Sequence, residues 1–139
     1  MNHFIRYWLP VFAWSALILL TSSDLFSAHH SGDLIAAILG RFLSASQIET
    51  LNVVLRKTLH LTGYGILGAL GFRAARGDKR TFALHWAVIG VAIAVSVASI
   101  DEWHQTLIPS RGGSFADVLL DAAGATTAQV IAWARNARA

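Results

Sequence analysis

One short stretch of the sequence concentrates most of the side chains that could do chemistry. Residues 101–121 carry four acidic residues, a histidine, a glutamine and an arginine between two apolar runs. Asp101 and Glu102 are adjacent at the expected end of an apolar helix, where the helix dipole disfavours acidic side chains and like charges repel. A helix built only for stability would carry basic residues there. The pair therefore needs a counter-charge, for which Arg111 and Lys57 are the candidates.

Asp121 is a second acidic residue in an unusual place. It lies about two turns into an apolar segment, where an unpaired carboxylate costs on the order of 2.5–3.5 kcal/mol. We therefore expect Asp121 to face the protein interior and to pair with His60, Tyr64 or a basic residue, or to be protonated. Asp117, four residues earlier, shares its helix face. Asp117 has the alternative role of a helix-cap residue together with Ser114.

A binding site for an anionic ligand is the first function that these residues indicate. Arg111, with Lys57 or Arg56, would hold an anionic lipid head group or a carboxylate through charge-assisted hydrogen bonds. Asp101, Glu102 and Gln105 would fix the arginine and accept protons from ligand hydroxyl or amine groups. The support for this hypothesis is the expected mixed-charge cluster at the depth of lipid head groups.

A membrane-embedded enzyme is the second possibility. Glu102 or Asp101 would act as a general base on a lipid-linked substrate, with His60 or His104 as the acid/base partner. Arg111 would stabilise developing negative charge. A third possibility is purely structural: the polar residues lock the helices together through buried ion pairs. The residues alone leave these three alternatives open.

The sequence does not predict a metal site or a cofactor. Five residues have acceptable ligand types, but no two of them form a compact ligand motif, and the nearby arginines oppose a cation. The chain has no cysteine, which removes thiolate ligands, disulfides and cysteine nucleophiles. The five ligand-type residues are His60, Glu102, His104, Asp117 and Asp121.

The elements that must position these side chains are strongly apolar. Of the 139 residues, 55% are hydrophobic and 14% are charged, whereas soluble domains carry about 25% charged residues. A chain this short cannot bury so much apolar surface in its own interior. The composition therefore favours a membrane protein. Nucleic-acid binding is disfavoured because the net charge is only +3 and no basic patch has interleaved aromatics.

Four membrane-spanning helices are expected, in a single domain that covers residues 1–139. The first segment also resembles a signal peptide, but a retained helix is favoured because three further spans follow. The sequence thus predicts an all-α, integral membrane four-helix bundle. The four spans are expected at about residues 6–23, 53–73, 81–101 and 114–134.

Two local patterns refine this bundle. Apolar residues recur at helical spacing within residues 34–43, which predicts a short amphipathic helix between spans 1 and 2. It would lie either in the membrane interface or against the bundle. Ser46 and Glu49 match a capping box, which predicts the start of the long second helix.

The charges at the span ends predict an orientation. One side carries seven basic residues and one acidic residue, and the other side carries four basic and seven acidic residues. The positive-inside rule then places both termini in the cytoplasm. Residues 101–121 and the start of the second span, with Arg56, Lys57 and His60, would converge on the outer face. The seven basic residues of the inner side are Arg6, Arg73, Arg76, Lys79, Arg80, Arg135 and Arg138.

At these positions the sequence resembles the VanZ-like family of small bacterial membrane proteins. A K-x-x-H-x-x-x-Y-x-x-L pattern is followed by D-E-x-x-Q, P-x-R and D-x-x-x-N-x-x-G in the family. Asp121 stands where the family usually has asparagine, which adds a possible charge. The resemblance implies a four-helix protein of the bacterial cytoplasmic membrane and a role in resistance to the lipoglycopeptide teicoplanin, but no mechanism. The matching residues are Lys57, His60, Tyr64, Leu67, Asp101, Glu102, Gln105, Pro109, Arg111, Asp117, Asp121 and Gly124.

The predicted site therefore has two sets of residues, with membrane lipids or a lipid-linked envelope precursor as the expected partner. The sequence indicates no oligomeric state. The candidate catalytic residues are Glu102, Asp101 and His60. The candidate ligand-binding residues are Arg111, Lys57, Gln105, His104, Tyr64, Asp117 and Asp121.

Overall fold

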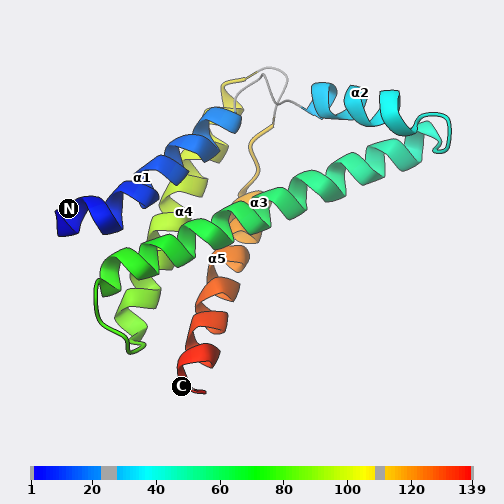
Figure 1. The fold of residues 1–139 in the computed structure, drawn as a ribbon. Helices are drawn as coiled ribbons and strands as arrows, with labels where there is room; N and C mark the ends of the chain where they lie inside the picture. The colour runs from blue at the N-terminus through cyan, green and yellow to red at the C-terminus, as the bar shows by residue number, and fades with distance from the viewer. Residues whose placement is uncertain (1, 23–27, 109–111, 139) are drawn as a thin grey trace.

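The computed structural model describes residues 2–22, 28–108 and 112–138, and all regular structure in them is helical. The expected all-α class is therefore confirmed for the described residues. The described residues form five helices, and Figure 1 shows their arrangement. They are α1 (His3–Thr21), α2 (Ala28–Leu39), α3 (Ala45–Arg76), α4 (Leu84–Thr106) and α5 (Phe115–Asn136).

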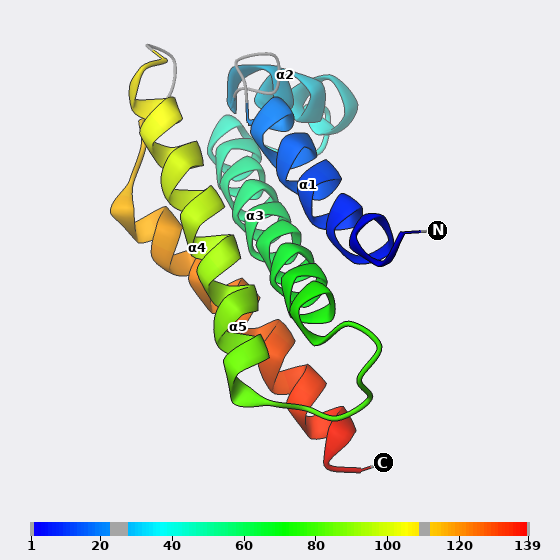
Figure 2. The same cartoon turned by 90° about the vertical axis from the view of Figure 1, so that its left-hand side faces the viewer.

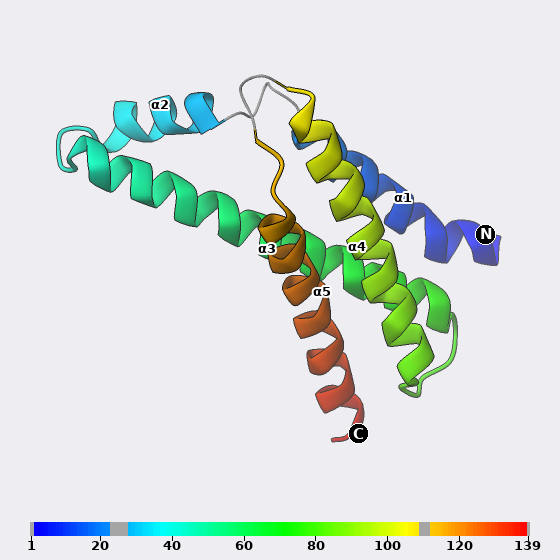
Figure 3. The ribbon, with the colours of Figure 1, turned by 180° about the vertical axis from the view of Figure 1, so that it is seen from behind.

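Helix α3 is the central element of the fold. It has 32 residues and packs against each of the other four helices. At 1.5 Å per residue it is roughly 48 Å long, well beyond the roughly 30 Å of a bilayer core. Its C-terminal half lies between α1 and α4 in Figure 2 and is crossed by α5 in Figure 3, while its N-terminal half projects beside α2. The helices thus surround one half of α3 rather than forming four equal parallel rods.

The start of α3 differs from the prediction by two residues. The Ser44 Oγ accepts a hydrogen bond from the Gln47 backbone N–H at 3.4 Å, and the Gln47 Oε1 accepts one from the Ser44 N–H at 2.8 Å. The capping box is therefore Ser44–Gln47, and the predicted Ser46–Glu49 box is wrong. Both quartets fit the capping pattern, and the earlier one adds helical residues and their hydrogen bonds.

Helix α2 occupies the position expected for the short helix but lies further toward the N-terminus than residues 34–43. It packs on the N-terminal half of α3, where the Ser31 Oγ donates a hydrogen bond to the Asn52 Oδ1 at 2.8 Å. Leu34 and Ile38 remain exposed, at 63% and 65%. The helix therefore contacts its neighbour with one face and presents apolar side chains on another.

Three helices, α1, α4 and α5, are long and apolar enough to cross a membrane. Large apolar side chains on their outer faces are exposed, among them Leu9, Val88 and Val130, as expected for surfaces that face lipid. Helix α3 is not among the three, because its C-terminal half carries His60, Tyr64 and several glycines and is less apolar. The expected span at residues 53–73 stays a prediction.

Glycines bring α4 and α5 close to α3. A Cβ atom on Gly68 would lie 3.0 Å from the Cα and Cβ of Ala125, and one on Gly71 would lie 3.0 Å from the Cα of Gly90. Small residues at such crossings let helix backbones pack directly against each other. The close approach fixes where the polar side chains of the three helices meet.

The first turns of α1 are attached to the connector between α3 and α4. The Tyr7 hydroxyl donates a hydrogen bond to the Asp78 carboxylate, and His3 Nε2 and Arg6 Nη1 lie 3.2 and 3.7 Å from its oxygens. The hydrogen bond from Tyr7, aided by the nearby positive charges, lowers the pKa of Asp78 below its ordinary value. This end of the molecule is basic, since Arg73, Arg76, Arg80 and Arg135 line one cavity there.

Candidate functional site

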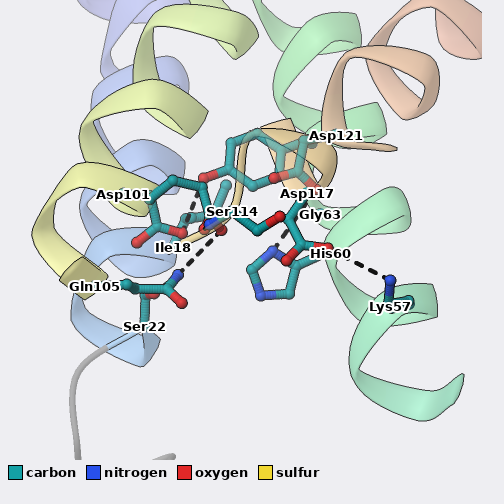
Figure 4. A network of polar contacts seen from close by, with 12 residues as sticks. Ile18, Ser22, Lys57, His60, Gly63, Asp101, Gln105, Ser114, Asp117 and Asp121 are labelled. Carbon is teal, nitrogen blue, oxygen red and sulfur yellow. Dashed lines mark hydrogen bonds and ion pairs between the residues drawn. The ribbon is translucent and has the colours of Figure 1, made fainter. Parts of the chain in front are cut away.

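A second polar cluster lies where the middle of α3 meets the end of α4 and the start of α5 (Figure 4). Its side chains come from two stretches far apart along the chain, residues 57–64 and 101–121, as the sequence predicted. Helix α3 contributes polar residues from two turns, α4 contributes its last turns, and α5 contributes its first two turns. The members are Lys57, His60, Tyr64, Asp101, Glu102, Gln105, Asp117 and Asp121.

Asp101 is fully buried, at 0% exposure, and among the described residues its hydrogen-bond partner is a tyrosine. The Tyr64 hydroxyl donates a hydrogen bond to the Asp101 Oδ2 at 3.1 Å, whereas the Oδ1 has no hydrogen-bond partner in the described part of the chain. Helix α4 continues past this residue to Thr106. Asp101 and Glu102 therefore lie inside the last turns of the helix and face its neighbours, rather than standing at the helix end.

Glu102 connects α4 to the beginning of α5. Its Oε2 accepts a hydrogen bond from the Ser114 backbone N–H at 2.7 Å, and its Oε1 accepts one from the Gln105 Nε2 at 3.3 Å. Gln105 also donates to the Ser22 Oγ at the end of α1, at 2.9 Å. Gly113 leaves no room for a side chain against the Glu102 carbonyl. These contacts tie three helices to one carboxylate.

Asp121 faces the interior, at 1% exposure, and lies beside His60. Its Oδ1 is 3.6 Å from the His60 Nδ1, and neither Asp121 oxygen has a hydrogen-bond partner among the described residues. Of the expected partners that the structure describes, the histidine is the one beside Asp121. The His60 side chain is 27% exposed and reaches from this buried carboxylate toward solvent.

Lys57 pairs with Asp117 and not with the acidic pair of α4. The Lys57 Nζ lies 3.5 Å from the Asp117 Oδ1, and both side chains are partly exposed. Ser114 caps α5 itself, because its Oγ accepts a hydrogen bond from the Ala116 N–H. The first turn of a helix also favours the negative charge of Asp117. The Lys57 counter-charge predicted for Asp101 and Glu102 is thus used elsewhere.

Two residues of the predicted site, His104 and Arg111, are not among the described members of this cluster. His104 is exposed on α4 and lines neither of the cavities beside the cluster. Arg111 lies outside the described residues, so its predicted roles are neither supported nor contradicted. Ser22 was missed by the sequence reasoning, because a serine at the end of an apolar span carries no distinctive signal. Arg56 was named only as an alternative to Lys57.

Two cavities adjoin at the cluster. The first, called the polar cavity below, has about 250 Å³, and most of its lining residues are charged or polar, among them Arg56, Lys57, His60, Glu102 and Asp117. The second, called the apolar cavity, has about 430 Å³ and is lined mainly by residues of α1 and α3. Arg56 and His60 line both, so the two cavities are adjacent. The lining of the second cavity also includes Trp14, Leu17, Ile18, Leu59, Tyr64 and Asp101.

Atoms that can bind a metal also converge here. His60, Asp101 and Glu102 each offer one such atom, and the three atoms lie within 4.8 Å of one another. The sequence shows no compact ligand motif because the histidine comes from α3 and the two carboxylates from α4. The convergence exists only in the tertiary structure.

The fold and the cluster define a class: an α-helical protein with membrane-length apolar helices and a buried histidine–carboxylate site between them. The chain belongs to the VanZ/LLP1 family, whose family model matches residues 7–136. That range contains every residue of the cluster and confirms the resemblance seen in the sequence. Together with the three apolar helices, it identifies a membrane protein. No curated protein and no solved structure matches the chain.

Proposed function

We propose that this protein binds an amphipathic envelope ligand, with an anionic head group in the polar cavity and an apolar chain in the adjoining one. The observation that supports this most directly is the shared lining of the two cavities by Arg56 and His60. A volume of about 250 Å³ is below the roughly 300–1,000 Å³ of pockets that enclose a drug-sized ligand. It suits a head group better than a whole lipid.

The charges at the cavity favour an anionic group. Within the described part of the chain Arg56 makes no ion pair, so its guanidinium is available to a phosphate or carboxylate. Lys57 is held by Asp117 at the rim, in a pair exposed enough to exchange partners. Glu102 and Gln105 line the same cavity. The Glu102 carboxylate can accept hydrogen bonds from head-group hydroxyls, and the Gln105 amide can donate or accept them.

The proposal includes a membrane topology. The C-terminal half of α3, at residues 53–73, would be the fourth span of a single four-helix domain in the bacterial cytoplasmic membrane. Its support is the position of this half between α1, α4 and α5. The arginine-lined end would face the cytoplasm, with both termini, and the cavities would face the exterior.

Cysteine labelling tests the topology, because the chain has no native cysteine. Gly112→Cys marks the cavity end, where an added side chain meets nothing within 4 Å, and Lys79→Cys marks the basic end. An impermeant maleimide applied to intact cells or spheroplasts should label the Gly112 variant alone. It should label the Lys79 variant only after permeabilisation. The reverse pattern would contradict the outward-facing cavity.

Native mass spectrometry tests the binding. Wild-type protein mixed with bacterial lipid extract should retain an anionic lipid or lipid-linked precursor, and Arg56→Gln should reduce its occupancy at least about tenfold. Arg41→Gln is the matched control, since Arg41 is exposed and lines neither cavity. Equal retention by both variants, or no lipid on the wild type, would reject the proposal.

An enzyme acting on a lipid-linked substrate is a second candidate, favoured by the meeting of His60, Asp101 and Glu102 within 4.8 Å. Glu102 or Asp101 would serve as general base and His60 as acid/base partner. In the same spectra this activity would appear as a changed head-group mass that Glu102→Gln abolishes. If neither lipid binding nor lipid modification depends on these residues, the result supports the structural alternative, in which the polar residues hold the helices together.

A contribution to teicoplanin resistance belongs to the binding proposal. Expression of the wild type in a sensitive host should raise the inhibitory concentration of teicoplanin, and Arg56→Gln should remove that increase while Arg41→Gln keeps it. Matched protein levels are required for each strain. An increase that both variants retain would separate resistance from the cavity.

A further inference from the structure

We propose that His60, Asp101 and Glu102 form a binding site for one divalent cation of the Zn²⁺ or Mn²⁺ type, with Asp121 supporting His60. This inference does not depend on lipid binding, because it concerns the cluster itself.

The distances between the ligand atoms are close to those of a metal site. One ring nitrogen of His60 and one carboxylate oxygen each of Asp101 and Glu102 lie within 4.8 Å of one another. Zinc binds nitrogen and oxygen ligands at about 2.0–2.2 Å, so two ligands of one ion stand at most about 4.4 Å apart. Small side-chain rotations would bring all three atoms into contact with a shared ion.

The buried carboxylates favour the binding of a cation. Asp101 and Asp121 are 0% and 1% exposed, yet the Asp101 Oδ1 and both Asp121 oxygens have no hydrogen-bond partner among the residues that the structure describes. Within residues 2–22, 28–108 and 112–138, no lysine or arginine pairs with Asp101, Glu102 or Asp121. Buried charges in proteins are normally paired or coordinate a metal. A divalent ion would compensate the two carboxylates that bind it.

The neighbours of the three ligands orient them as second-shell groups do in metal sites. Tyr64 holds one oxygen of Asp101 and leaves the other free. Ser114 and Gln105 hold Glu102. Asp121 lies 3.6 Å from the His60 Nδ1, and a carboxylate beside a metal-bound histidine is a common arrangement that fixes the ring.

The site would have access from both cavities. His60 and Glu102 line the polar cavity, and His60 and Asp101 line the apolar one. Three protein ligands leave a coordination position open for water or for an anionic ligand group. The donor set of one imidazole and carboxylates, without sulfur, suits Zn²⁺ or Mn²⁺.

Metal analysis of the purified protein is the direct test. Full-length protein in detergent is stripped with EDTA, loaded with Zn²⁺ or Mn²⁺ alone and freed of excess metal before elemental analysis. We expect about one ion per chain. Glu102→Gln and His60→Gln should weaken binding at least about tenfold. The matched control Glu49→Gln, at an exposed position of α3 that lines neither cavity, should bind as the wild type does.

A spectroscopic readout on the wild type avoids dependence on the folding of the variants. Mn²⁺-loaded protein should show nitrogen coupling from one imidazole in pulsed electron paramagnetic resonance. Circular dichroism and gel filtration establish which variants are folded. The proposal is overturned if the wild type binds well under one ion per chain, if the bound Mn²⁺ has no nitrogen coupling, or if folded Glu102→Gln and His60→Gln both bind like Glu49→Gln.

Discussion

The Glu102 carboxylate accepts a hydrogen bond from the backbone N–H of Ser114, with 2.7 Å between the Glu102 Oε2 and the Ser114 nitrogen. Ser114 is the N-cap of α5, so a side chain of one helix satisfies the backbone at the start of the next. The connector between the two helices is thereby anchored at the site where the cavities meet. A residue with a candidate functional role thus also positions α5.

The first prediction separates these two roles of Glu102. Glu102→Ala leaves the Ser114 N–H without its acceptor and should lower the free energy of unfolding by about 1–2 kcal/mol. Glu102→Gln keeps a side-chain oxygen that can accept the hydrogen bond from Ser114, so it should lower the free energy of unfolding by less. Equilibrium unfolding in detergent measures both variants. An equal loss for the two would show that charge rather than the hydrogen bond matters for stability.

The second prediction concerns Tyr64 and Asp101. Tyr64→Phe removes the donor to the buried Asp101 Oδ2 and should destabilise the protein by about 1–3 kcal/mol. A double-mutant cycle with Asp101→Asn should give a coupling free energy of roughly 0.5–3 kcal/mol. Additive effects of the two substitutions would mean that the hydroxyl and the carboxylate do not interact in the folded protein.

The third prediction tests the close crossing of α3 and α4. A Cβ atom on Gly90 would lie 2.9 Å from the Phe72 backbone nitrogen and 3.1 Å from the Gln129 Nε2. Gly90→Ala should therefore push the helices apart and cost about 1–3 kcal/mol. Gly63→Ala is the control, because its Cβ would meet nothing within 4 Å. Thermal unfolding should show the Gly63 variant to be as stable as the wild type or more stable.

The fourth prediction is a pH dependence from Asp78. Its pKa is lowered in the folded protein, mainly by the hydrogen bond from Tyr7. The resulting stabilisation is present above the ordinary aspartate pKa of about 4, and is lost as the pH falls through the lowered value. Tyr7→Phe should therefore destabilise the protein more at about pH 5 than at about pH 3. Protonation of Asp78 at low pH reduces the stabilising contribution of its charge in the wild type, so the wild type and the variant then differ less.

Chemical unfolding at the two pH values measures this difference. Phe4→Leu, at an exposed position of the same helix as Tyr7, serves as the control and should show no pH-dependent difference. A Tyr7→Phe effect of the same size at both values would contradict a role for the Asp78 charge.

Several features were determined by the sequence alone. Its high apolar content and low charge predict a membrane protein, because 139 residues cannot hide so much apolar surface. The cost of a carboxylate inside an apolar segment predicts that Asp121 faces the interior. The alternation of spans and connectors predicts that the start of the second span meets residues 101–121. These inferences need only composition, spacing and the energetics of single residues.

The tertiary structure decided which side chains pair. Among the described residues, Tyr64 donates a hydrogen bond to Asp101, Lys57 pairs with Asp117, and Glu102 binds the start of α5. Such pairings depend on how far α4 and α5 approach α3 and how each helix is rotated. Contacts at glycines set both quantities, and no local pattern in the sequence encodes them. For the same reason, the convergence of His60 with two carboxylates is visible only in the folded chain.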